Sequence, residues 1–162
     1  MLMSIGGKEN PENARVIARN RRASHDFHLE ETLVCGVSLL GSEVKALRNS
    51  QVSFEEAYAR LEDGELWLLN LHIPEYQGSS YMNHEVRRPR KLLVKKKELA
   101  KLMTRVDNKG KTLVPLRLMF NARGLVKVEI AVAMGKQAHD KRDAIRKRED
   151  QRDIARAMGR RR

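Results

Sequence analysis

Two apolar stretches in the last third of the chain, 112–120 and 125–134, carry the pattern that most restricts its fold. Every second residue is apolar in both, namely Val114, Leu116, Leu118 and Phe120, then Val126, Val128, Ile130, Val132 and Met134. Side chains alternate between the two faces of a strand, so this period predicts antiparallel strands that cover a core with one face. The short link between them ends in Gly124. A β-hairpin is therefore predicted here.

Other segments predict further strands and two helices. We expect an extended segment at 27–40, a short helix at 43–48 capped by Ser42, strands at 57–62 and 65–71, and an amphipathic helix at 96–106. Asp63-Gly64 suits a two-residue hairpin turn. The capping-box spacing from Ser53 to Glu56 predicts one more helical turn. Short strands with an inserted helix predict a mainly β fold with short helices, an OB-like small antiparallel β-barrel.

The chain divides into three predicted parts. Residues 1–18 form a loose leader, 19–134 the barrel, and 135–162 an extended basic tail. From Lys136 onward the tail has eleven Lys and Arg against five Asp and Glu, a net charge of +6 out of the chain's +12. It has too few large apolar residues to offset the entropy of ordering. We therefore expect the tail to be disordered when free and to order on a polyanion.

Composition points to a nucleic-acid partner. The 162 residues have a sequence pI near 10.2, which favours phosphate backbones, and only 4% aromatic residues, which favours recognition by shape and phosphate over base stacking. Cys35 is the single cysteine, so we expect no intrachain disulfide and a reducing cytoplasm. No apolar run is long enough for a bilayer. We expect no membrane partner.

Sequence motifs for catalysis, metals and cofactors are absent. The run Ser24-His25-Asp26 has the residue types of a hydrolytic triad, but neighbours in sequence do not converge in space. Gly110-Lys111-Thr112 resembles the end of a phosphate-binding loop, but Arg105 stands where that motif needs glycine. The five histidines show no ligand spacing. We expect neither an enzyme nor a metal or cofactor site.

Two basic clusters precede predicted strands, at 20–22 and at 87–91. Each alone is typical of a solvated surface. Together with the tail they predict binding of a polyanion, because such a ligand relieves their mutual repulsion.

Four blocks resemble the SsrA-binding protein (small protein B) family in order and spacing. They are Asn20-Arg21-Arg22-Ala23-Ser24-His25-Asp26-Phe27, Gly41-Ser42-Glu43-Val44-Lys45-Ala46-Leu47-Arg48, Arg88-Pro89-Arg90-Lys91-Leu92-Leu93 and Gly135-Lys136-Gln137-Ala138-His139-Asp140-Lys141-Arg142. The family has an OB-fold barrel that binds the tRNA-like domain of transfer-messenger RNA (tmRNA). With elongation factor Tu it brings alanyl-tmRNA to stalled bacterial ribosomes, which resume translation and tag the nascent chain.

The resemblance and the basic clusters together imply two sets of RNA-binding residues. Those for the tRNA-like domain are Asn20, Arg21, Arg22, His25, Arg88, Arg90, Lys91 and Leu93. Those for the decoding region and the empty message channel, which the tail enters as a helix, are Gly135, Lys136, His139, Asp140, Lys141, Arg142, Arg146, Lys147 and Arg148. One departure from the family is Val34, where relatives often have an acid. The resemblance implies a non-enzymatic cytoplasmic protein, and we expect a monomer.

Two alternatives remain open from the sequence. A structural ribosomal protein could also bury a basic tail in ribosomal RNA. An RNA-modifying enzyme on the same fold is the weaker alternative, because no convergent acids or metal ligands are visible.

Overall fold

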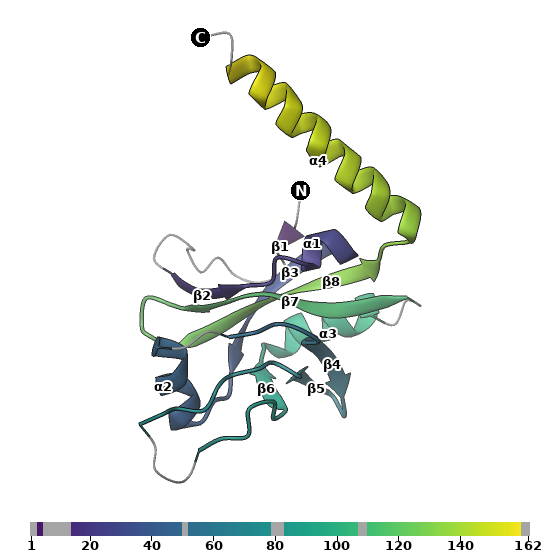
Figure 1. The fold of residues 1–162 in the computed structure, drawn as a ribbon. Helices are drawn as coiled ribbons and strands as arrows, with labels where there is room; N and C mark the ends of the chain where they lie inside the picture. Colours follow the sequence, from purple (N-terminus) through teal and green to yellow (C-terminus); the bar gives the residue numbers. More distant parts are fainter. Residues whose placement is uncertain (1–2, 5–13, 50–51, 79–82, 107–109, 160–162) are drawn as a thin grey trace.

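A computed structural model describes residues 3–4, 14–49, 52–78, 83–106 and 110–159 (Figure 1). The strands are β1 (Met3–Ser4), β2 (Arg15–Arg19), β3 (Phe27–Val37), β4 (Tyr58–Glu62), β5 (Glu65–Leu69), β6 (Arg90–Leu93), β7 (Lys111–Phe120) and β8 (Val126–Gly135). The helices are α1 (Ala23–Asp26), α2 (Gly41–Asn49), α3 (Lys96–Val106) and α4 (Ala138–Gly159).

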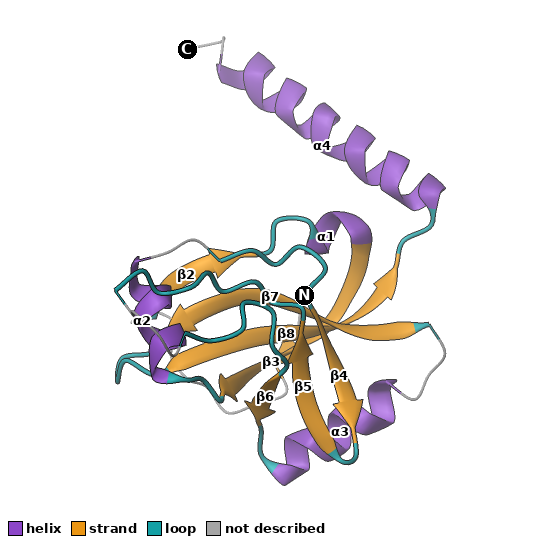
Figure 2. Cartoon of the chain, turned by 60° about the horizontal axis from the view of Figure 1, so that its bottom comes forward, coloured by secondary structure: helices purple, strands orange, loops and turns teal. Residues whose placement is uncertain are grey.

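Six strands close into a ring. β3 pairs with β6, β6 with β5, β5 with β4, β4 with β7, β7 with β8, and β8 returns to β3, every pair antiparallel. The β4–β7 seam has the fewest register pairs of the ring, with Ala59 opposite Leu113 as its one pair among the described residues. Figure 2 shows the strands curving around a common interior. The predicted antiparallel barrel is confirmed.

The predicted helix at 96–106 and both predicted hairpins are present. In the β4–β5 turn, Asp63 and Gly64 have φ of 50° and 73°, the two positive values that this tight turn requires. In the longer β7–β8 link, Asn121 Oδ1 accepts hydrogen bonds from the N–H groups of Arg123 and Leu125 at 3.1 and 2.9 Å. Local sequence is sufficient for these turns.

The alternation predicted for 112–120 is wrong in its first half. The pairing of β7 with β8 shifts by one residue between Pro115 and Arg117. Leu118 belongs to the main core, whereas Val114 and Leu116 pack on the other side of the sheet with Ala23 of α1. A bulge moves the residues beyond it to the opposite face. β7 therefore serves two apolar clusters.

Two further expectations differ from the structure. The leader predicted at 1–18 contains two paired strands, because β1 pairs with β3 and β2 pairs along β7, while residues 5–13 lie outside the described part. The turn predicted as helical at Ser53 is instead a bridge to His72, and Ser53 Oγ accepts a hydrogen bond from the Glu55 N–H at 3.2 Å. Side-chain capping of a single turn competes with helix formation at such sites.

The tail contains a helix of 22 residues, α4, that projects from the barrel (Figures 1 and 2). Its large apolar residues Ile145, Ile154 and Met158 are 41%, 55% and 71% exposed. The expectation that this segment orders only on a polyanion stays a prediction. None of the described helices combines the length and apolarity needed to cross a membrane.

Candidate nucleic-acid interface

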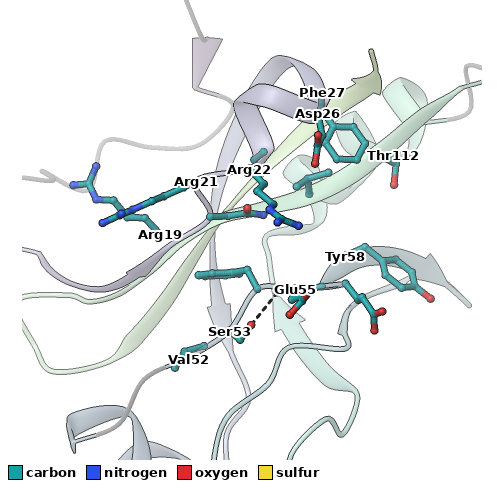
Figure 3. A pocket seen from close by; sticks show the side chains of 16 residues that line it. Arg19, Arg21, Arg22, Asp26, Phe27, Val52, Ser53, Glu55, Tyr58 and Thr112 are labelled. Carbon is teal, nitrogen blue, oxygen red and sulfur yellow. Dashed lines mark hydrogen bonds between the residues drawn. The ribbon is translucent and has the colours of Figure 1, made fainter. Parts of the chain in front are cut away.

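A cleft of about 730 Å³ opens where β2 turns into α1 (Figure 3). One wall runs from Arg19 to Phe27, and the facing wall is the loop 52–58 before β4. Thr112 and Val114 of β7 complete its lining. The first of the basic clusters predicted from the sequence therefore lies on the edge of a concave surface.

Asn20 holds the basic turn against the barrel. Its backbone N–H donates to the Leu116 carbonyl at 2.7 Å, and its side-chain amide donates to the Pro115 carbonyl at 3.0 Å. Both acceptors lie beside the bulge in β7. The Asn20 side chain thus positions the residues that follow it, Arg21 and Arg22.

Three arginines of this wall, Arg19, Arg21 and Arg22, are exposed. Within the described ranges none of them forms an ion pair, although many of the other basic side chains do. An arginine with no internal carboxylate partner retains its donors for phosphate oxygens. These side chains are therefore available to phosphate groups at the edge of the cleft.

The second basic cluster is engaged inside the protein. Glu43, fully buried in α2, accepts from Arg88 Nε and Nη2 at 2.8 and 2.7 Å and from Arg90 Nε at 2.8 Å. Arg90 is 0% exposed and also donates to the carbonyls of Leu71 and Val86 at 2.7 and 3.1 Å. The predicted RNA contact of Arg90 is therefore wrong. Its guanidinium cross-links α2 to the barrel.

The buried cluster predicts loss of stability in acid. Burial alone raises the pKa of Glu43, but hydrogen bonds from Arg88 and the Leu40 N–H, together with Arg90, hold it below its ordinary value of 4.5. The unfolded chain then binds the proton more readily, so stability is complete above about pH 4.5 and falls as the pH drops further. We expect the urea midpoint to fall between pH 5 and 3. A constant midpoint over that range would contradict this account.

The second cluster reaches the cleft only at Arg87, which pairs with Glu56 of the facing loop at 3.0 Å, whereas Lys91 and the neighbouring Leu93 lie far from the cleft. Lys91 pairs with Glu65 at 2.7 Å, and Leu93 is 54% exposed beside Gly36. β3 runs from the α1 end of the barrel at Phe27 to Gly36, a span of about 30 Å at strand rise. Figures 1 and 2 show β6 and α1 at different ends of the barrel. Of the eight residues assigned to one RNA domain, Arg90 is buried, and the other seven are divided between these two ends of the barrel.

The outer face near Leu93 includes Val34, the residue at which this chain departs from the family pattern. Val34 shares its face of β3 with Gly36 and is 37% exposed. At Gly36 an added Cβ would lie 3.2 Å from Leu93 Cβ, so the glycine makes room for this apolar contact. The second surface therefore includes the apolar side chains of Val34 and Leu93.

The root of the tail lies beside the first surface. Lys136 donates its N–H to the Asp26 carbonyl and its Nζ to the Ser24 carbonyl, both at 3.0 Å, and Lys141 Nζ lies 3.6 Å from Asp26 Oδ1. The hydrogen bond from His25 Nδ1 at 2.9 Å and the charge of Lys141 hold the pKa of Asp26 below its ordinary value. The structure thus brings His25 next to the predicted tail set.

The structure describes the side chains of only some of the remaining predicted tail residues. Gly135 ends β8, and the side chains of His139 and Asp140 lie outside the described part. The other four are exposed along α4: Arg142, Arg146, Lys147 and Arg148. Their RNA contacts stay predictions.

Sequence reasoning missed the facing wall of the cleft. Glu55 and Tyr58 are exposed there, and Phe27 lines the other side. No local pattern indicates a binding role for Glu55 or Tyr58, because the segment 52–58 faces the arginines only when the barrel closes.

Comparison with known proteins identifies the family. The family model described as SmpB protein matches residues 17–160. The chain belongs to the SmpB family. The resemblance drawn from the four sequence blocks is therefore confirmed.

SmpB relatives are similar along most of their length. Proteins named SsrA-binding protein are 51% identical in Acidothermus cellulolyticus (91% of this chain, 92% of the relative) and 52% in Symbiobacterium thermophilum (88% and 90%). A solved structure described as "tmRNA-SmpB: a journey to the center of the bacterial ribosome" superposes with a TM-score of 0.66 at 48% identity. It covers 80% of this chain and 94% of that chain. The OB-like barrel of this SmpB chain thus has a close solved counterpart.

Proposed function

We propose that the chain binds tmRNA and acts on the ribosome in trans-translation, as the names of its SmpB relatives and its structural counterpart indicate. The observation that carries this for the present chain is the contrast among its basic residues. Arg19, Arg21 and Arg22 are exposed and have no ion-pair partner in the described ranges, whereas Arg90 is buried in an internal cluster. The tRNA-like domain is assigned to the surface that carries the cleft.

The tail supplies the second half of the proposal. α4 presents Arg142, Arg146, Lys147 and Arg148 to solvent along a rod about 33 Å long at helical rise. A cationic helix of this length fits an anionic groove, such as a message channel without message. We assign recognition of the empty channel to α4 and delivery of alanyl-tmRNA, with elongation factor Tu, to the barrel.

We propose a binding role without catalysis, in a monomer. In the described ranges no group of three or more His, Cys, Asp or Glu side chains could hold a metal ion. Burial raises the pKa of Cys35, a core residue, to about 12, so its thiol stays protonated and is a poor nucleophile. Incubating the protein with tmRNA, with and without magnesium, tests the absence of catalysis. An enzyme acting on RNA would cleave or modify the tmRNA.

Substitution of Arg21 and Arg22 by alanine tests the RNA surface. Each phosphate that is no longer neutralised should reduce the slope of log affinity against log salt by about 1, so we expect the double variant to be shallower by about 2. The measurement is filter binding of tmRNA at a series of salt concentrations.

The matched control is the double replacement of Lys96 and Lys97 by alanine. These lysines are exposed on α3, and Figure 2 shows α3 at the other end of the barrel from α1. Equal effects of both double variants would mean that the RNA surface is wrongly assigned. Absence of tmRNA from the protein purified from cells would contradict the proposed function itself.

A further inference from the structure

The two walls of the cleft carry opposite charges. On the first wall Arg19, Arg21 and Arg22 outnumber the one acid, Asp26, and the facing loop carries Glu55 and Glu56. In Figure 3, Arg22 and Glu55 face one another across the opening. No ion pair joins these side chains in the described part of the chain, so the cleft keeps them apart. A ligand that fits must present negative charge to one wall and hydrogen-bond donors to the other.

Of the two adjacent acids, Glu55 is the one that a ligand can use. Glu56 is bound to Arg87 through Oε2 at 3.0 Å, whereas the carboxylate of Glu55 has no ion-pair partner among the described residues. The hydrogen bond from the Glu55 N–H to Ser53 Oγ fixes the loop beneath it. Glu55 and Glu56 are both acidic and exposed, but only the Glu55 carboxylate is free to bind a ligand.

A nucleotide fits the two oppositely charged walls of the cleft better than other anions do. Inorganic phosphate or an acidic peptide would gain at the arginines but meet repulsion at Glu55. A nucleotide has phosphates at one end and, on some bases, an amino group at the other. Phe27 on the first wall and Tyr58 on the facing wall, which is 37% exposed, add ring surface to the lining. The cleft volume of about 730 Å³ lies within the usual range of small-ligand sites.

We propose that the cleft holds a single nucleotide turned out of the bound RNA, with its phosphates at Arg21 and Arg22 and its base edge at Glu55. This rests on the proposed function and adds base selectivity to it. A carboxylate accepts hydrogen bonds but cannot donate them, so it selects a base with an exocyclic amino group. Cytosine N4 is the usual partner of glutamate, whereas uracil presents O4, another acceptor, at the same position.

The test uses transcripts of the tRNA-like domain in which each unpaired cytidine is replaced in turn by uridine. We expect one replacement to weaken binding to the wild-type protein about tenfold. Glu55→Gln should abolish that discrimination, because an amide can accept from cytosine or donate to uracil. Glu56→Gln is the matched control and should retain it. Glu55→Gln should also bind all transcripts slightly more tightly, since it removes a negative charge near RNA.

The outcomes separate this inference from the proposed function. Binding of the transcripts with no cytidine whose effect depends on Glu55 would overturn the base-reading cleft alone. Tight binding of free CMP, with no effect of the transcript replacements, would overturn the assignment to RNA. Failure of the wild-type protein to bind any transcript would instead refute the proposed function.

Discussion

Glu43→Ala is expected to lower the free energy of unfolding by about 3–5 kcal/mol, the usual consequence of removing one partner of a buried ion pair. Arg90 would stay fully buried with its counter-charge gone, and the Leu40 N–H and Arg88 would lose their acceptor. The whole fold is affected because Glu43 joins α2 to the segment that leads into β6. Urea unfolding followed by circular dichroism measures the change.

An exposed ion pair provides the control. Glu65→Ala removes the partner of Lys91, where both side chains are 43% exposed, and should cost about 1 kcal/mol or less. If the two variants lose the same stability, the buried cluster is not a structural cross-link. Folded Glu43→Ala molecules should bind tmRNA with wild-type affinity, because the cluster lies outside the cleft surface to which the RNA is assigned.

A chain that ends at Gln137 is expected to bind tmRNA nearly as tightly as the full chain and to lose tagging of stalled nascent chains. The truncation keeps β8 and the contacts of Lys136 with α1, so the barrel is retained and the cleft loses only the pairing of Lys141 with Asp26. It removes α4 and with it every basic side chain assigned to the message channel except Lys136. Filter binding and a stalled-ribosome tagging assay in vitro measure the two effects.

Two full-length variants show whether charge or the helix is responsible. Alanine at Arg142, Arg146, Lys147 and Arg148 keeps helix propensity and should reproduce the loss of tagging. Alanine at Asp143, Glu149 and Asp150 removes charge of the other sign from the same helix and should leave tagging intact. Full tagging by the truncated chain would refute the division of labour between barrel and tail.

Elements with a strong local signal could be predicted from the sequence. The period of 96–106 predicts α3, and Asp63-Gly64 predicts the β4–β5 turn, because neighbouring side chains decide both. The alternation in 125–134 likewise predicts β8. The bulge in β7 could not be read in this way, because Val114 and Leu116 are apolar whichever cluster they join.

Some residues of the candidate site could also be predicted from the sequence, and others could not. The cluster at Arg21 and Arg22 was predicted, since a run of arginines before a strand is visible in one dimension. Arg90 shows the limit, because its RNA assignment treated all basic residues as surface charges. Its burial depends on Glu43, 47 residues away in sequence. Glu55 was missed for the opposite reason, as its importance comes only from what it faces.

The sequence by itself determined the family, the antiparallel barrel and the excess of positive charge, because these depend on motif order, on period and on composition. Only the tertiary structure decided which arginines can meet phosphate and which hold the protein together. The physical reason is that closing the ring buries some charges beside carboxylates and leaves others on a cleft, and Coulomb energy depends on those distances and on access to water.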